Sequence, residues 1–229
     1  MLLQTFSCPS ELHTSLTTYI TTLLKQAIEE RGQASLVVPG GSTPITLFNQ
    51  LSTAPLPWSK VLVTLSDERW VDENHPDSNA KMVKEQLLIN QASKAHFLPL
   101  NLSHTSADEA ALASNKQLSS QPTFDITLLG MGSDGHFASL FPDSQALKSG
   151  LDPTNPTSSI AVTPPHSDHS RISMTLTRLL DSRELILFFR GQTKHDVFIE
   201  AKQTEDIYLL PIAAIIKQDR TPLTAYWAP

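Results

Sequence analysis

Short apolar runs alternate with longer segments of helical periodicity along most of this 229-residue chain. Six of these runs are candidate strands, at residues 34–38, 61–65, 124–130, 160–163, 171–175 (which is ambiguous) and 184–189. Helices are predicted from Ser10, as the cap, to Gly32 and over residues 44–51, 78–88, 106–118 and 192–202. Because strands that alternate with helices form parallel sheets, we expect an α/β fold with a mostly parallel sheet covered on both faces.

Composition sets the class of protein and disfavours several kinds of partner. Hydrophobic residues make up 40% of the chain and charged residues 17%, which is typical of a globular protein. A net charge of -6 disfavours binding to nucleic acid and to anionic membranes. The single cysteine, Cys8, excludes an internal disulfide and any multi-cysteine metal site. With neither a signal peptide nor a membrane-spanning run in the sequence, we expect a cytoplasmic protein.

Residues 152–169 are rich in Pro, Ser and Thr and are interpreted as a long surface loop beside the active site. A linker between two domains is the alternative. The segment that follows is short and contains few predicted elements, so we expect one domain over residues 1–229.

The segment from Leu129 to Pro142 carries the clearest chemical signal. It follows a predicted buried strand and places three glycines around Asp134 and His136. Glycines allow a sharp turn and close approach to a ligand. An imidazole that is mostly neutral at cytosolic pH can take a proton from water, and Asp134 can hold its tautomer or orient a substrate. The alternative, a histidine that only caps local backbone, is disfavoured in such a loop.

A second glycine-containing loop, Gly40-Gly41-Ser42-Thr43, lies between a predicted strand and a predicted helix. Thr43 fits the N-cap and Pro44 the first helical position. Backbone N–H groups and the positive end of a helix dipole form an anion site at such a place, although a plain turn has the same composition. The lysine of a Walker A loop is missing.

Three cations follow or begin predicted elements and are candidate ligands of an anionic substrate: Arg69, Arg171 and Lys194. Each is also compatible with an ordinary surface charge, and Arg69 with an ion pair to Asp67 or Glu68. These two carboxylates are a candidate catalytic pair, but adjacent side chains usually point apart.

Other chemistries are poorly supported. There is no Gly-x-Ser-x-Gly elbow, and the formal Gly-x-Gly-x-x-Gly match at residues 130–135 lacks the acidic residue that ends a second strand in dinucleotide-binding folds. The tract His166-Ser167-Asp168-His169 lies in a polar loop and is interpreted as a solvated surface. We therefore expect neither a metal nor a cofactor.

Taken in order, five segments resemble the 6-phosphogluconolactonase family of the glucosamine-6-phosphate deaminase/lactonase superfamily. They are residues 39–44, residues 66–71 with 77–79, residues 130–142, residues 171–175 and residues 191–194. The resemblance implies a three-layer Rossmann-like fold. It also implies hydrolysis of 6-phospho-D-glucono-1,5-lactone to 6-phosphogluconate, a step of the oxidative pentose phosphate pathway. Phe137 departs from the family, which usually has threonine there.

The mechanism that we expect is metal-free, with a small phosphosugar lactone as the partner of a monomer or weak dimer. His136 activates water, and Arg171 or backbone N–H groups of residues 132–135 stabilise the oxyanion. The Gly40–Thr43 loop, Arg69 and Lys194 surround the anionic substrate. Two alternatives are a glucosamine-6-phosphate deaminase-like isomerase and a non-catalytic sugar-phosphate sensor. The deaminase is disfavoured because Phe141 and Arg69 replace a glutamate and a tyrosine of its pattern.

Overall fold

A seven-stranded parallel sheet forms the centre of the computed structural model, which describes residues 1–100, 106–165 and 167–229. Every neighbouring pair in this sheet runs parallel. Across the sheet the strands are β1 (Leu2–Thr5), β10 (Leu223–Ala228), β9 (Ser182–Arg190), β6 (Phe124–Leu129), β2 (Ala34–Val38), β3 (Val61–Leu65) and β5 (His96–Leu98). The predicted parallel α/β sheet is confirmed.

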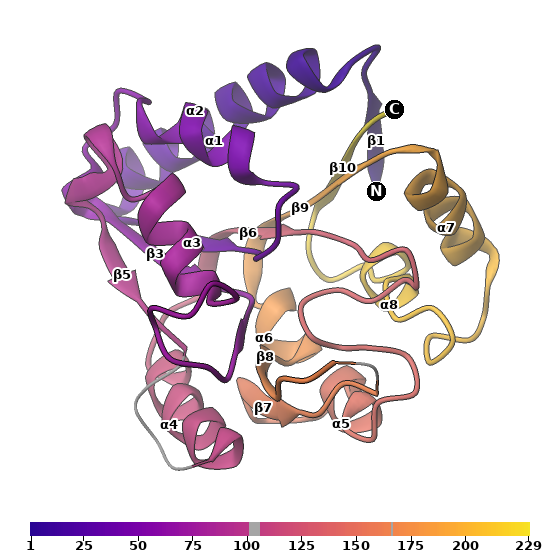
Figure 1. Cartoon of the computed structure of the whole chain (residues 1–229). Coiled ribbons are helices and arrows are strands. Elements are labelled where there is room, and N and C mark those ends of the chain that lie inside the picture. The colour runs from indigo at the N-terminus through magenta and orange to yellow at the C-terminus, as the bar shows by residue number, and fades with distance from the viewer. Residues whose placement is uncertain (101–105, 166) are drawn as a thin grey trace.

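Helices cover both faces of this sheet and give the three layers (Figure 1). Figure 1 shows α1 (Pro9–Arg31) and α2 (Ile45–Ser52) above the sheet, and α6 (Leu176–Leu180) and α8 (Ala213–Ile216) below it. The remaining helices are α3 (Asn79–Gln86), α4 (Ala107–Ser119), α5 (Leu147–Leu151) and α7 (Gln192–Gln203), with short 3-10 turns at Trp58–Lys60 and Asn90–Lys94. No helix in the described ranges is long and apolar enough to cross a bilayer.

The long helix α1 shows why the spacing of apolar residues predicted a helix here. Its buried apolar residues recur at helical spacing and include Leu12, Leu16, Ile20 and Leu24, each fully buried. Gly32 ends the helix in the left-handed conformation, and its N–H donates to the Ile28 carbonyl at 2.9 Å, as a C-terminal glycine cap should.

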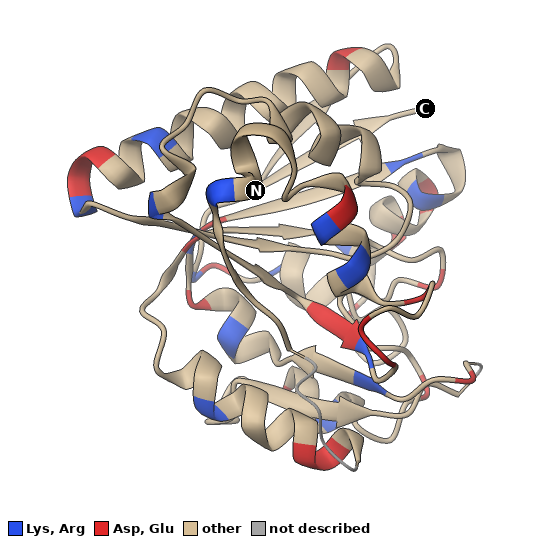
Figure 2. Cartoon of the chain, turned by 60° about the vertical axis from the view of Figure 1, so that its left-hand side comes forward, with Lys and Arg blue, Asp and Glu red and all other residues tan. Residues whose placement is uncertain are grey.

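A smaller antiparallel sheet lies beside the main one. It consists of β4 (Asp67–Arg69), β8 (Arg171–Met174) and β7 (Ser159–Val162), in the order β4-β8-β7. The predicted strands at 160–163 and 171–175 are thus present, but they belong to this sheet. Strand β4 consists of Asp67, Glu68 and Arg69, so it carries charges of both signs. Figure 2 marks the acidic and basic residues along the ribbon.

The order of the main strands places a crevice between β2 and β6. The chain leaves β2 toward β3 on one side, whereas it leaves β6 toward β9 on the other. The loops that follow β2 and β6 therefore diverge and leave a gap at the carboxyl edge of the sheet, where ligands bind in open α/β folds.

Several boundaries differ from the sequence prediction. The first helix begins at Pro9 with Cys8 in the cap position, so Ser10 is not the cap. The second begins at Ile45 with Pro44 as its N-cap, one residue later than predicted. Strands β1, β4, β5 and β10 were not predicted, and three of them extend the sheet at its margins.

Candidate active site

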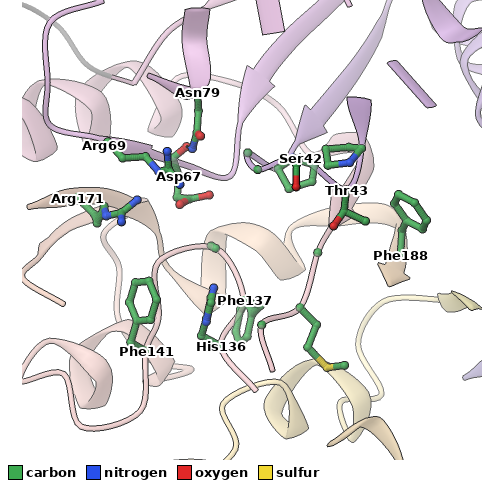
Figure 3. Close-up of a pocket in the computed structure, with 18 of the residues that line it drawn as sticks. Ser42, Thr43, Asp67, Arg69, Asn79, His136, Phe137, Phe141, Arg171 and Phe188 are labelled. Carbon is green, nitrogen blue, oxygen red and sulfur yellow. The ribbon is translucent and has the colours of Figure 1, made fainter. Parts of the chain in front are cut away.

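A cavity of about 350 Å³ opens at the carboxyl edge of the sheet and is formed by loops that are distant in sequence. Figure 3 shows Asp67, Arg69 and Arg171 gathered on one side of it, with His136 pointing into it from below. The predicted site residues that line it are Gly40, Gly41, Ser42, Thr43, Arg69, His136, Arg171 and Lys194. The remaining predicted residue, Asp134, stands behind His136 and contacts its ring.

The pair Asp134 and His136 is held by a tight turn after β6. Oδ1 of Asp134 lies 2.6 Å from Nδ1 of His136 and also accepts the His136 backbone N–H at 3.2 Å. Burial alone would raise the pKa of Asp134, but the hydrogen bonds and charge of His136 outweigh it and lower that pKa. A carboxylate on Nδ1 places the proton there and leaves Nε2 as the basic nitrogen.

Gly132 is required by this turn. A Cβ at Gly132 would lie 2.2 Å from Nδ1 of His136 and 2.3 Å from Oδ1 of Asp134. No side chain fits there without breaking the contact between the carboxylate and the imidazole. The other side of the imidazole packs on the Phe141 ring at 4.3 Å between centroids, so an apolar surface faces the candidate base.

Arg69 and Arg171 are direct partners across the antiparallel pair of β4 and β8. Like charges in this arrangement repel each other and destabilise the pair. Burial and the charge of Arg69 lower the pKa of Arg171, yet a guanidinium stays protonated at neutral pH. Such a pair is typical of a site that is neutralised by a bound anion.

Hydrogen bonds hold both guanidinium groups in place. Nη1 of Arg69 donates to the Asp77 carbonyl at 2.6 Å, and Nη2 of Arg171 donates to Oγ of Ser167 at 2.9 Å. Nε of Arg171 is buried and has no hydrogen-bond partner in the described part of the chain. The alternative reading of Arg69, an ion pair with Asp67 or Glu68, is not what the described residues show.

Lys194 reaches the cavity from the first turn of α7. Burial lowers the pKa of its ammonium group, and the negative charge of Asp134 opposes that shift. The positive ends of α7 and α2 thus both lie at the cavity, which favours an anion there.

The loop after β2 is shaped by close packing against α3. A Cβ at Gly40 would lie 2.0 Å from the side-chain oxygen of Asn79, so only glycine allows this approach. Because Pro44 takes the cap position, the hydroxyl of Thr43 is not used as the predicted N-cap. Ser42 and Thr43 instead face the cavity (Figure 3).

The two adjacent carboxylates of β4 point apart, as the sequence suggested. Glu68 is buried and accepts the backbone N–H groups of Asn79 and Ala80, each at 2.7 Å, at the start of α3. Burial raises its pKa, although these hydrogen bonds oppose the shift. Asp67 faces the cavity and accepts the hydroxyl of Ser139 at 2.6 Å.

Sequence reasoning considered Asp67 only as a member of a carboxylate pair and did not place Asn79 or Phe188 in the site, although all three line the cavity. In the sequence, Asn79 stands out only as part of the family-like segment 77–79. The signal available for it was its position directly after Ser78, whose side chain caps α3. Phe188 gives no such signal, because a buried aromatic residue in a strand usually belongs to the core.

Comparison with known proteins agrees with this geometry. A 6-phosphogluconolactonase of Rhizobium meliloti is 40% identical over 98% of this chain and 97% of its own length. A 6-phosphogluconolactonase of Pseudomonas aeruginosa is 37% identical over 99% of this chain and 94% of its own length. The crystal structure of a 6-phosphogluconolactonase from Shewanella baltica matches with a TM-score of 0.97 at 38% identity, over 100% of this chain and 98% of that one. The sequence model of the glucosamine-6-phosphate isomerases/6-phosphogluconolactonase family matches residues 7–226. The chain belongs to this family.

Proposed function

We propose that this protein hydrolyses 6-phospho-D-glucono-1,5-lactone to 6-phospho-D-gluconate, as a cytoplasmic step of the oxidative pentose phosphate pathway. One observation carries the proposal: the Asp134–His136 pair and three cations, Arg69, Arg171 and Lys194, meet at one cavity. A base that can activate water and a set of charges that can hold a phosphate are what this reaction needs. The names of the similar lactonases support the same substrate.

In the proposed reaction, Nε2 of His136 removes a proton from a water molecule. The resulting hydroxide attacks the lactone carbonyl carbon, and a tetrahedral oxyanion forms. The bond from that carbon to the ring oxygen then breaks, and the ring oxygen takes the proton back from the histidinium. Asp134 stabilises the charged imidazole between these two transfers. No metal takes part in any of these steps.

Arg171 is the better candidate for the oxyanion partner. The alternative donors, backbone N–H groups of residues 132–135, are partly used within the turn: the N–H of Gly132 donates to His136 and that of Gly135 donates to Gly132. Arg171 keeps N–H capacity without a protein partner among the described residues. Arg69, Lys194 and the Gly40–Thr43 loop then hold the phosphate and sugar hydroxyls.

The deaminase alternative is disfavoured by the position of Phe141. Its ring packs against His136 at a tilt of 38°, where an amine-releasing enzyme of this superfamily is expected to need a carboxylate. An apolar ring transfers no proton, so Phe141 cannot supply the acid–base group that the deaminase reaction is expected to need at this position.

One assay separates the three candidate functions. The purified protein is given freshly made 6-phosphogluconolactone or glucosamine 6-phosphate, beside a protein-free control at the same pH, because δ-lactones also open spontaneously. The proposal predicts faster lactone hydrolysis, unchanged by EDTA, and no ammonia. Ammonia release would support the deaminase, and phosphosugar binding without either reaction would support the sensor.

A further inference from the structure

A second group of chemically active side chains lies at the outer rim of the cavity. His75 and Asp77 come from the loop between β4 and α3, and His169 comes from the segment just before β8. One potential ligand atom from each of the three residues lies within 4.8 Å of the other two. Nε2 of His169 is 3.2 Å from Oδ2 of Asp77, and Nδ1 of His75 is 3.8 Å from the same oxygen.

These three residues offer the same kinds of donor atom as open zinc sites use. Two imidazoles and one carboxylate, with a fourth position left for water or an external ligand, are typical of Zn²⁺ sites that exchange ligands. The two rings meet edge to face at 5.3 Å. Nδ1 of His75 accepts the Asp77 N–H at 3.1 Å, so an ion bound through this nitrogen would displace that hydrogen bond. The side chains are 31–54% exposed, so they have room to move toward a shared ion.

The surroundings provide space and a further carboxylate. A cavity of about 280 Å³ beside the cluster is lined by Arg69, Asp77, Ser167, Asp168, His169 and Arg171. The positive charges of Arg69 and Arg171 repel a cation at this place, whereas the carboxylates of Asp77 and Asp168 attract it. Because these charges largely cancel, a bound metal ion must gain its affinity from the two imidazole nitrogens. Zn²⁺ and similar ions prefer nitrogen ligands, whereas Mg²⁺ and Ca²⁺ prefer oxygen ligands.

We propose that His75, Asp77 and His169 bind one divalent transition-metal ion, with Zn²⁺ as the fitting member of this class. The tract containing His166 was set aside on sequence grounds. His166 lies outside the described residues, and His169 is the one described residue of that tract that joins the cluster. A bound ion would tie the loop that holds Arg69 to the segment that leads into Arg171. It is a rim site apart from His136, and its existence does not depend on the proposed lactonase activity.

The test is calorimetric titration of the full-length protein with Zn²⁺ in a phosphate-free buffer. We expect one ion per chain. Loss of a residue that merely supports a metal ligand weakens binding by ~10–100-fold, so His75→Ala and His169→Ala should weaken it at least as much. His96→Ala, at the opposite end of the sheet, and Cys8→Ser are the matched controls and should bind as the parent does.

Asp77→Asn gives a second, nearly isosteric variant, and thermal melting of each variant shows that it is folded. Weaker Zn²⁺ binding in all three folded cluster variants, with unchanged controls, supports the site. Absence of binding at millimolar Zn²⁺, or equal affinity in the parent and the cluster variants, overturns it. Because no turnover is measured, failure here leaves the proposed lactonase function unaffected.

Discussion

The two edges of the parallel sheet each carry a cavity with arginine side chains, but in the described part of the chain these arginines form ion pairs at only one of the two edges. At the carboxyl edge, the described residues form no ion pair with Arg69, Arg171 or Lys194 around the cavity of about 350 Å³. At the amino edge, a cavity of about 450 Å³ is lined by Arg31, Arg183 and Asp125 among others. There Nη2 of Arg31 lies 2.8 Å and Nε of Arg183 lies 3.5 Å from Oδ1 of Asp125.

The direction of the helices explains the contrast. Helices α2 and α7 begin at the carboxyl edge, where their positive ends add to unpaired cations and favour an anionic ligand. Helix α1 ends at the amino edge, where Arg31 in its last turn complements the negative end of the dipole. Asp125 also accepts the N–H and hydroxyl of Ser35. Cations therefore stabilise the fold at one edge and are available to a substrate at the other.

The largest expected effect comes from removing the base at the carboxyl edge. His136→Ala should lower kcat roughly 100- to 10,000-fold, because the water is no longer deprotonated, while affinity for 6-phosphogluconate barely changes. Steady-state kinetics and product binding measure the two quantities. His96→Ala, at the amino edge, is the matched histidine control and should keep parental kcat. A kcat within a few-fold of the parent would remove His136 from this role.

The next effect distinguishes the two arginines of the β4–β8 pair. Loss of one charge-assisted hydrogen bond costs about 1.5–3 kcal/mol, which corresponds to roughly 10- to 150-fold. Arg69→Ala should raise KM by this factor and make inorganic phosphate a weaker competitor, whereas Arg171→Ala should act mainly on kcat. The matched control, Arg31→Ala, should leave both constants unchanged. If Arg69→Ala and Arg171→Ala change the same constant equally, the division of roles between them is wrong.

A substitution at the amino edge should lower the stability of the fold and leave the activity unchanged. Asp125→Asn removes the negative charge shared by Arg31 and Arg183, and the Asp125 side chain is only 11% exposed. We expect the free energy of unfolding to fall by about 1–3 kcal/mol, with kcat/KM unchanged below the melting range. Urea denaturation beside a lactonase assay measures both. A large loss of kcat/KM in the folded variant would show that the amino edge also serves the reaction.

The smallest effect is a pH dependence of binding. Burial lowers the pKa of Lys194 from its ordinary value of 10.5, so the free protein loses this charge earlier as pH rises. Affinity for 6-phosphogluconate should therefore decrease by less than ~10-fold as pH rises to about 10, because the ligand phosphate is already a dianion there. Lys194→Arg should abolish the decrease, since a guanidinium stays charged. The same decrease in both proteins would assign it to another group.

The sequence predicted the interior of the sheet better than its margins. Strands β2, β3, β6 and β9 are long or continuously apolar because both faces are covered. By contrast, β1 is mostly exposed and β5 has only three residues, so neither carries the expected pattern. Strand β10 has the sequence Leu-Thr-Ala-Tyr-Trp-Ala, which shows no regular alternation of apolar and polar residues. Its place depends on pairing with β1 and β9, which local sequence does not encode.

In the candidate site, too, local features were predictable and contacts between distant segments were not. Residues within local turns, such as the Asp134–His136 pair, were predictable because spacing alone brings them together. The pairing of Arg69 with Arg171 was not predictable, because it results from the register between two strands about a hundred residues apart in sequence. The cluster of His75, Asp77 and His169 is the same case, since the tract around His169 contains only one of its members.

Amide hydrogen exchange with and without 6-phosphogluconate tests the comparison of the two edges most directly. We predict that the ligand slows exchange in residues 40–44, 130–137 and 191–195, which surround the carboxyl-edge cavity, and leaves residues 31–35 and 121–125 unchanged. The His136→Ala protein should show the same protection, because its binding site remains. Protection confined to residues 31–35 and 121–125 would contradict the account, since it would place the phosphosugar where the cations are already paired.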